Sequence, residues 1–166
     1  MTGSETRSGD LAAAAIGLLI RRGETIATAE SLTGGLVAAA LTSVPGSSEA
    51  FRGGIVAYAT DLKAELLGVP TDLLERHGAV HPAVAAAMAE GVRARLGTET
   101  GIATTGVAGP DAAEGKPVGM VFVAVSGPGG TVGRELALTG DRQVVRAASV
   151  EGVLDLLVAS LREDIS

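Results

Sequence analysis

Short apolar runs typical of buried strands alternate with helical segments along most of this 166-residue chain. Such alternation favours an α/β fold, and a predicted hairpin before the last helix makes the sheet mixed rather than wholly parallel. The expected strands are residues 24–29, 54–59, 100–105, 120–125 and 131–138. The expected helices are residues 10–22, 33–42, 70–77, 82–96 and 141–161, with a further helical turn from Thr60.

The length suggests one domain with a sizeable core. We expect this domain to span residues 10–166, with Asp10 as the N-cap of its first helix. Residues 1–9 are polar and contain Gly and Ser, so they are expected to form a flexible N-terminal segment.

Composition argues against several kinds of protein. The chain has no Cys, which excludes disulfides and thiolate chemistry, and its two His, His77 and His81, are expected to be capping or surface residues. A net charge of −6 with only three aromatic residues argues against nucleic-acid binding. No signal segment or long apolar run is evident, so we expect a cytoplasmic protein without a membrane partner.

Residues 28–35, Thr-Ala-Glu-Ser-Leu-Thr-Gly-Gly, connect a predicted strand to a predicted helix. A helix N-terminus carries unpaired N–H groups and the positive end of the helix dipole, which suit an anion or an oxyanion. Ser31 is therefore either a nucleophile beside backbone donors or, like Thr33, a simple N-cap. The sequence of this segment alone leaves both interpretations open.

Two further junctions have the same form, at residues 104–110 and 139–142. Ligands of open α/β sheets collect beyond the carboxyl ends of the strands, so the three loops are predicted to line one pocket. The alternative is that their Gly and Thr residues only turn the chain and cap helices. None of the three matches a P-loop or a Gly-x-Gly-x-x-Gly fingerprint, so neither nucleotide motif is present.

Lys63 is a candidate base for Ser31, because neither His is placed as an obvious partner. The chain has eleven Arg but only two Lys, and a Lys whose pKa is depressed can accept the proton of a Ser hydroxyl. Tyr58, the only Tyr, stands five residues before it and is a candidate proton relay or positioning group. Separately, these residues are also compatible with a solvated helix position and a core-edge aromatic.

Arg142 directly follows Asp141, the expected N-cap of the last helix, and its guanidinium suits a phosphate or carboxylate. A cation at that end of a helix is slightly unfavourable unless it binds an anion. Ser48, after Pro45-Gly46, is expected near the site, and Lys116 is either a lid residue or an exposed one.

Taken together, the motifs resemble the CinA C-terminal domain family, whose characterised members are nicotinamide-nucleotide amidases. The resemblance covers nearly the whole chain. It rests on residues 28–35, Pro-Gly-Ser-Ser (45–48), Tyr58 with Lys63, His-Gly-Ala-Val (77–80), Thr-Gly-Val-Ala-Gly-Pro (105–110), Lys-Pro-Val-Gly (116–119) and Gly-Asp-Arg (140–142).

The resemblance implies a three-layer α/β/α sandwich with a mixed, mostly parallel sheet. It implies hydrolysis of nicotinamide mononucleotide (NMN) to nicotinate mononucleotide and ammonia, with no metal or cofactor. Ser31 would be the nucleophile, a neutral Lys63 its base, and Tyr58 a neighbour, with an oxyanion held near Gly34, Gly35 or Gly106. The positions that match pocket or phosphate contacts are Thr33, Gly34, Gly35, Ser48, Thr105, Gly106 and Arg142.

The family also implies a homodimer or higher homo-oligomer. Leu32 and Val107 depart from residues common in the family, Cys and Ile, without affecting the proposed chemistry. Two alternatives remain open from the sequence: a non-catalytic nucleotide-binding or regulatory module, and an amidase for another small amide.

Overall fold

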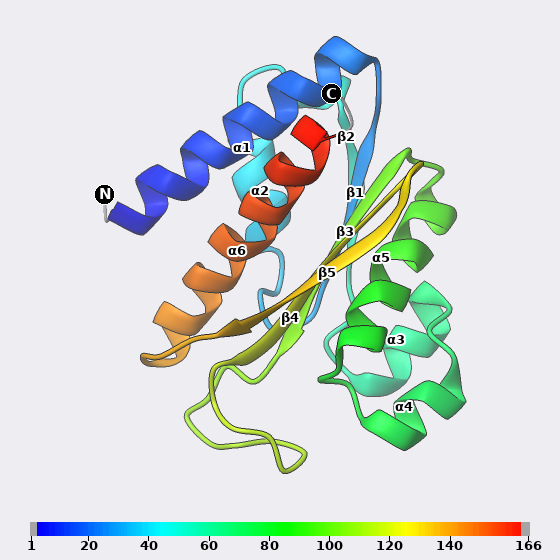
Figure 1. The fold of residues 1–166 in the computed structure, drawn as a ribbon, viewed down its shortest axis with the longest axis vertical. Helices are drawn as coiled ribbons and strands as arrows, with labels where there is room; N and C mark the ends of the chain where they lie inside the picture. The colour runs from blue at the N-terminus through cyan, green and yellow to red at the C-terminus, as the bar shows by residue number, and fades with distance from the viewer. Residues whose placement is uncertain (1–2, 164–166) are drawn as a thin grey trace.

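A five-stranded sheet in the order β2-β1-β3-β4-β5 forms the middle layer of the computed structural model, which describes residues 3–163 (Figure 1). The strands are β1 (Ile26–Glu30), β2 (Phe51–Val56), β3 (Thr100–Gly106), β4 (Met120–Gly127) and β5 (Gly130–Ala137). The helices are α1 (Gly3–Arg22), α2 (Leu36–Thr42), α3 (Thr60–Leu67), α4 (Thr71–His77), α5 (Pro82–Leu96) and α6 (Arg142–Glu163), with a 3₁₀ turn η1 (Ser47–Glu49).

Strand direction brings several loops to one end of the sheet. β1 pairs in parallel with both β2 and β3, whereas β4 is antiparallel to its two neighbours, β3 and β5. Four of the five strands therefore run in the same direction. Their carboxyl ends, together with the start of β4, form the edge at which open α/β sheets bind ligands. The mixed α/β/α architecture is the one expected from the sequence.

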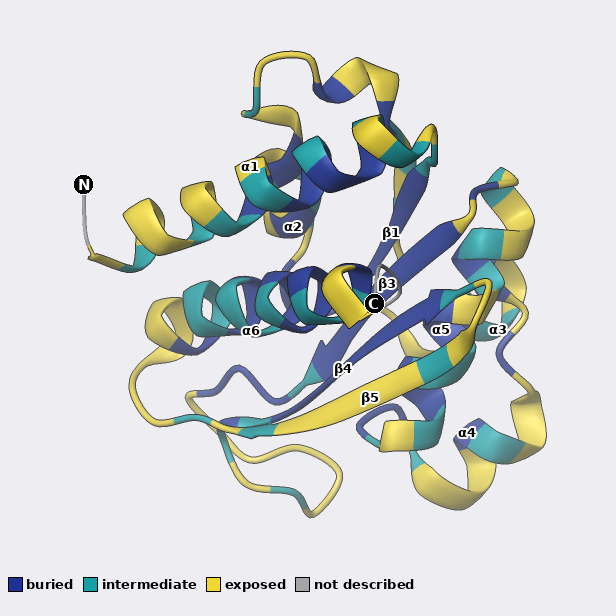
Figure 2. Ribbon diagram, turned by 45° about the horizontal axis from the view of Figure 1, so that its top comes forward, coloured by how far each residue is buried: buried dark blue, intermediate teal, exposed yellow. Residues whose placement is uncertain are grey.

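Each face of the sheet is covered by a helical layer with its own apolar core. Helices α1, α2 and α6 pack on one face, around side chains such as Leu19, Leu41 and Leu154 that are fully buried. Helices α3, α4 and α5 cover the other face, around Leu67 and Met88. Burial on both sides explains why β1, β3 and β4 are enclosed, while the edge strand β5 is largely exposed (Figure 2).

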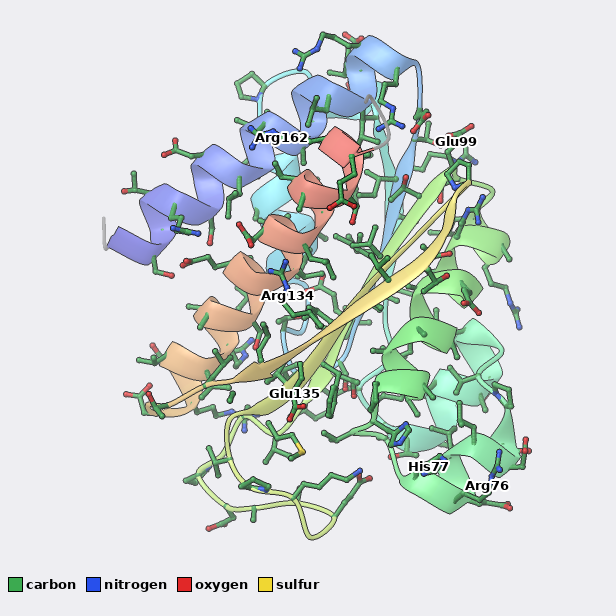
Figure 3. All side chains as sticks on the ribbon, viewed as in Figure 1. Arg76, His77, Glu99, Arg134, Glu135 and Arg162 are labelled. Carbon is green, nitrogen blue, oxygen red and sulfur yellow. The ribbon has the colours of Figure 1, made fainter. Side chains whose placement is uncertain are left out.

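The exposed edge strand β5 carries charged side chains. Arg134 Nη1 donates to Asp155 Oδ2 of α6 at 2.8 Å, and Glu135 is its neighbour on the strand (Figure 3). Charge on an edge strand opposes pairing with other chains, whereas an exposed ion pair contributes little to stability.

The first helix begins at Gly3 rather than at Asp10, so Asp10 lies inside α1 and is not its N-cap. The earlier turns contact α6: Ser4 Oγ donates to Glu151 Oε2 at 3.3 Å, and Arg7 forms an ion pair with Glu151 at 2.7 Å. Residues 3–9 are therefore helical and contact α6, although their polar composition predicted a flexible segment. Residues 1 and 2 of the expected flexible segment lie outside the described residues.

Strand β2 ends earlier than the sequence predicted, at Val56 instead of Ala59. Its register with β1 sets these bounds, because Phe51 pairs with Ile26 and Val56 with Glu30. Tyr58 therefore lies in the loop between β2 and α3. The predicted N-cap of the last helix is confirmed, since Asp141 Oδ1 accepts a hydrogen bond from the Val144 N–H at 3.0 Å.

No helix within residues 3–163 is both long enough and apolar enough to cross a membrane.

Candidate active site

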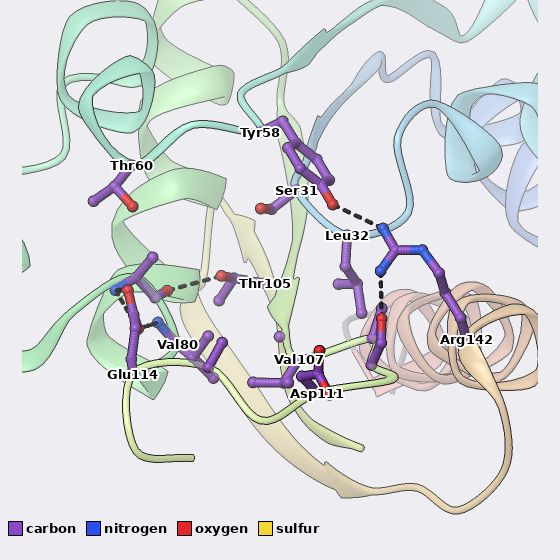
Figure 4. Close-up of a pocket in the computed structure, with 15 residues that line it drawn as sticks. Ser31, Leu32, Tyr58, Thr60, Val80, Thr105, Val107, Asp111, Glu114 and Arg142 are labelled. Carbon is purple, nitrogen blue, oxygen red and sulfur yellow. Dashed lines mark hydrogen bonds between the residues drawn. The ribbon is translucent and has the colours of Figure 1, made fainter. Parts of the chain in front are cut away.

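A pocket of about 240 Å³ lies at the carboxyl ends of the strands (Figure 4). The three loops expected to converge there all contribute to it, and the segments at Tyr58–Thr60 and Ala79–Val80 complete the wall. The lining residues are Ser31, Leu32, Tyr58, Thr60, Ala79, Val80, Thr105, Gly106, Val107, Ala108, Gly109, Asp111, Ala113, Glu114 and Arg142.

Ser31 is the first residue after β1, and backbone hydrogen bonds fix its position. Its N–H donates to the Thr104 carbonyl at 3.1 Å, which extends the β1–β3 ladder by one residue. Its carbonyl accepts from the Gly34 N–H at 3.1 Å, closing a tight turn. The side chain is thereby placed at the floor of the pocket, where 8% of the residue remains exposed.

Lys63 is buried beneath the pocket, and its amine contacts Ser31. The residue, from α3, is only 1% exposed, and its Nζ lies 2.9 Å from Ser31 Oγ. The same Nζ donates to the carbonyls of Ala57 at 2.8 Å and Tyr58 at 3.2 Å. The predicted contact between the Ser31 hydroxyl and the Lys63 amine is therefore present.

Burial lowers the pKa of Lys63 from 10.5 to about 8, and the negative charge of Glu114 partly opposes this shift. At pH 7 about a tenth of the amine is then neutral. The family resemblance implied a neutral resting amine, but with this pKa the charged form predominates at pH 7. A neutral amine keeps two N–H groups for the two carbonyls and directs its lone pair at Ser31, the arrangement that a general base requires.

Glu30 is a functional candidate that the sequence analysis missed. Its carboxylate is 1% exposed and accepts hydrogen bonds from the N–H groups of Val37 at 2.8 Å and Ala38 at 3.1 Å, in the first turn of α2. Thr33 Oγ1 donates to the same carboxylate at 2.6 Å and also contacts Thr104 Oγ1 at 2.8 Å. A Glu at a strand end that precedes a helix by a few residues is the sequence signal for this arrangement.

This network corrects the expected N-cap of α2. Neither Ser31 nor Thr33 caps the helix; the N-cap is Gly35, with φ of 109°, and the Glu30 carboxylate satisfies the first-turn N–H groups instead. A carboxylate at that helix end also occupies the place where an anion was expected to bind. The pocket lining does not include Thr33, Gly34 or Gly35. These residues form the turn that follows Ser31, in which the Gly34 N–H donates to the Ser31 carbonyl.

Ser48 lies away from the pocket. It is an exposed residue of η1, which leads into the amino end of β2, whereas the pocket lies at the carboxyl end. The backbone confirms this placement, because the Ile26 N–H at the start of β1 donates to the carbonyl of Ala50 at 2.8 Å. The expectation that Ser48 lies near the site is therefore wrong within this chain.

Arg142 and Tyr58 meet across the pocket mouth (Figure 4). Arg142 Nη2 donates to the Tyr58 hydroxyl at 2.9 Å, and Nη1 donates to the Gly109 carbonyl at 2.6 Å. The Tyr58 phenol thus contacts Arg142, and only the Tyr58 backbone carbonyl contacts Lys63. This geometry disagrees with the interpretation of the phenol as a proton relay for Lys63.

The opposite wall is tied together by side chains that bind backbone groups. Thr105 Oγ1 donates to the Ala79 carbonyl at 2.7 Å, and both oxygens of Glu114 accept from the Ala79 N–H at 3.1 Å. Lys116 Nζ donates to the carbonyls of His77, at 2.7 Å, and Val80. Lys116 therefore anchors the 107–119 loop to the segment before α5.

Gly106 admits no side chain at its position in the pocket wall. A Cβ there would lie 2.6 Å from Val121 Cγ2 and 2.8 Å from the Met120 carbonyl oxygen. The close approach of β3 to β4 explains why this part of the pocket wall is built from glycine.

The two histidines lie at helix ends, as expected. His81 is the N-cap of α5, where its Nδ1 accepts from the Ala83 N–H at 3.1 Å, and its ring stacks on His77 with centroids 3.9 Å apart. Burial, assisted by the positive charges of His77 and Lys116, lowers the pKa of His81. Within residues 3–163, no three His, Asp or Glu side chains are grouped as metal ligands.

The fold and the pocket define a class of protein: an α/β/α domain with a Ser–Lys pair at the carboxyl ends of its parallel strands. The chain belongs to the CinA C-terminal domain family, whose family model matches residues 8–161. This match bears out the resemblance seen in the sequence motifs.

Relatives support the assignment. A CinA-like protein of Frankia casuarinae is 55% identical over 142 residues, which cover 86% of this chain and 33% of the relative. A putative competence-damage inducible protein of Desulforudis audaxviator is 49% identical, with 87% of this chain and 35% of the relative covered. The chain spans about a third of the length of these curated relatives.

Solved structures agree with the fold. The competence/damage inducible protein CihA of Agrobacterium tumefaciens is 37% identical, with a TM-score of 0.89 and coverage of 94% of this chain and 96% of that one. A CinA superfamily protein of Escherichia coli is 33% identical, with a TM-score of 0.89 and coverage of 96% and 93%.

Proposed function

We propose that this protein hydrolyses the carboxamide of NMN to nicotinate mononucleotide and ammonia. The observation that carries the proposal is the 2.9 Å contact between Lys63 Nζ and Ser31 Oγ, with the amine buried and its pKa lowered to about 8. A nucleophile hydrogen-bonded to a base of depressed pKa is the signature of covalent catalysis.

In the acylation half, neutral Lys63 takes the proton of Ser31 Oγ as the oxygen attacks the carboxamide carbon. The resulting Lys63 ammonium is stabilised by the carbonyls of Ala57 and Tyr58, which already accept from Nζ. The tetrahedral intermediate then collapses, the C–N bond breaks, and the proton passes from Lys63 to the leaving nitrogen. The products of this half are ammonia and an ester on Ser31.

Backbone N–H groups beside Ser31 are candidates for the oxyanion hole. Within the described chain, the N–H of Leu32 has no acceptor in the protein, whereas the Gly34 N–H donates to the Ser31 carbonyl. The residue after the nucleophile often supplies an oxyanion donor at a strand–turn–helix junction. We therefore assign the role to the Leu32 N–H in place of Gly34.

In the deacylation half, a water molecule attacks the ester carbon while Lys63 accepts one of its protons. The C–Oγ bond breaks, and Lys63 returns that proton to Ser31 Oγ. The carboxylic acid product ionises on release. Overall, one amide and one water give one carboxylate and one ammonium ion, with no redox step.

Arg142 is the proposed phosphate-binding group. It lies across the pocket from the 79–80 wall, and its guanidinium forks toward the Gly109 carbonyl and the Tyr58 hydroxyl (Figure 4). A fork of this kind binds a phosphate through charge-assisted hydrogen bonds. The choice of NMN over other amides comes from the resemblance to nicotinamide-nucleotide amidases, and Arg142 is the residue on which that choice depends.

A substrate panel tests the proposal. Purified protein is incubated with NMN, nicotinamide or NAD, and ammonia is measured. We expect release from NMN, with Arg142→Ala raising the KM for NMN by about 10- to 100-fold because charge-assisted hydrogen bonds to the phosphate are lost. Faster release from nicotinamide, with a KM that Arg142→Ala leaves unchanged, would instead identify an amidase for small amides. Binding of NMN without ammonia would identify a non-catalytic nucleotide-binding module.

A further inference from the structure

The pocket has charged walls of opposite sign. Arg142 stands on one side and Glu114 on the other, and both residues line the pocket together with Ser31. Ser31 projects between these two walls in Figure 4. A substrate that spans the pocket therefore meets a cation at one end and an anion at the other.

The Glu114 carboxylate is fixed by backbone donors rather than by a cation. Its two oxygens accept from the Ala79 N–H at 3.1 Å, and Oε2 also accepts from the Val80 N–H at 3.3 Å. Within residues 3–163 it forms no ion pair at 4.0 Å or less, although Lys116 binds carbonyls of the same segment. Glu114 thus lines the pocket as a carboxylate held in the wall by backbone N–H groups.

The negative charge of Glu114 affects the Lys63 amine, which lies at the reacting end of the pocket. This charge raises the pKa of Lys63, whose amine contacts Ser31 Oγ, against the larger lowering caused by burial. The other pocket carboxylate, Asp111, lies two residues from Gly109, whose carbonyl binds Arg142. The Asp111 and Glu114 side chains lie apart from each other in the pocket wall (Figure 4).

Amide hydrolysis changes charge at one end of the ligand only. The carboxamide is neutral, whereas the product is a carboxylate, and the phosphate is the same in both. With the phosphate at Arg142 and the carboxamide carbon at Ser31 Oγ, the changed group faces the Thr105–Glu114 wall. A fixed negative charge there tolerates the neutral amide and opposes the attraction that the Lys63 ammonium exerts on the carboxylate.

We propose that Glu114 is a specificity-determining residue that distinguishes the carboxamide substrate from the carboxylate product and promotes release of that product. This inference rests on the proposed hydrolysis of NMN, with its phosphate at Arg142. In this proposal the Glu114 carboxylate has two roles, because it also holds the 107–119 loop against residues 79–80.

The test measures binding of the amide and acid forms without turnover. In a Ser31→Ala background, calorimetry gives the Kd of NMN and of nicotinate mononucleotide, with and without Glu114→Gln. Gln retains a side-chain oxygen that can accept from the Ala79 and Val80 N–H groups, so the loop keeps an anchor. We expect Glu114→Gln to lower the ratio of the acid Kd to the amide Kd by about tenfold.

Asp111→Asn is the matched control, because it removes the same charge from another position in the pocket wall. It is expected to change both Kd values together and to leave their ratio within about twofold. A ratio unaffected by Glu114→Gln, or changed equally by both variants, overturns the inference. Failure of either nucleotide to bind also overturns it. Ammonia release from NMN by the wild type is measured separately. An unchanged ratio of Kd values with normal ammonia release would contradict only the role of Glu114, whereas absence of ammonia release would contradict the proposed hydrolysis.

Discussion

The Lys63 amine lies 2.9 Å from the Ser31 hydroxyl, although 32 residues separate them in the chain. The two residues follow the neighbouring parallel strands β1 and β2, whose carboxyl ends share one edge of the sheet. Sheet topology therefore delivers the nucleophile and base to one place, and burial of the amine then lowers its pKa.

The first prediction concerns the pH dependence of kcat/KM. Since the base acts in its neutral form, activity is expected to rise with pH through about 8 and to level off above about 9. The measurement is kcat/KM for ammonia release between pH 6 and pH 10, corrected for enzyme stability. A profile that is flat from pH 6, or that falls through pH 8, contradicts a catalytic Lys63.

The second prediction concerns stability. The folded-state pKa of Lys63 is lower than the unfolded value, so the unfolded chain binds more protons between about pH 8 and pH 10.5, and the contribution of Lys63 to stability rises with pH across that window. The penalty of burying the charge at pH 7 is about 3 kcal/mol.

Comparing wild type with Lys63→Met isolates the pH-dependent contribution of the Lys63 amine to the unfolding free energy. The wild type is expected to gain about 3 kcal/mol of unfolding free energy relative to Lys63→Met between pH 7 and pH 10.5, measured by urea denaturation. A difference in unfolding free energy that stays constant over this pH range would mean that burial does not lower the pKa of the Lys63 amine.

The third prediction separates two roles for Tyr58. Its hydroxyl contacts Arg142 Nη2 and not Lys63, so Tyr58→Phe is expected to change kcat by less than about threefold while altering the KM for NMN through the freed guanidinium. Steady-state kinetics with NMN provides the measurement. Loss of kcat by a hundredfold or more with an unchanged KM would restore the phenol as a proton relay.

The fourth prediction concerns Glu30. Glu30→Gln replaces a carboxylate that accepts from two N–H groups at the α2 N-terminus and from Thr33 Oγ1, so unfolding free energy is expected to fall by about 1–3 kcal/mol. Glu49→Gln, at an exposed position of η1, serves as the control and is expected to stay within about 0.5 kcal/mol of wild type. Equal unfolding free energies for Glu30→Gln and Glu49→Gln would show that Glu30 does not stabilise the turn at Ser31.

The sequence was sufficient for the elements whose signal is local. Alternating apolar runs indicated the α/β architecture. Lys63 was identified as the candidate base for Ser31 because the chain has only two Lys and neither His was an obvious partner. Asp141 was also identified correctly, since an N-cap is bonded within its own first turn.

The missed features depend on contacts between distant segments. Helix α1 extends to Gly3 where its first turns contact Glu151 of α6, which no local propensity records. Ser48 was expected near the site because of its motif, but the parallel register of β2 places it at the other end of the sheet. Glu114 reaches the pocket only because a loop folds back onto residues 79–80.

In the proposed reaction Ser31 is the nucleophile of an amide hydrolysis and Lys63 is its base. Ammonia release from NMN by wild type, Ser31→Ala and Lys63→Met tests it most directly, with circular dichroism to confirm that each variant is folded. We expect kcat to fall by at least about a thousandfold in both variants while each still binds NMN. Turnover by folded Ser31→Ala at the wild-type rate would contradict it.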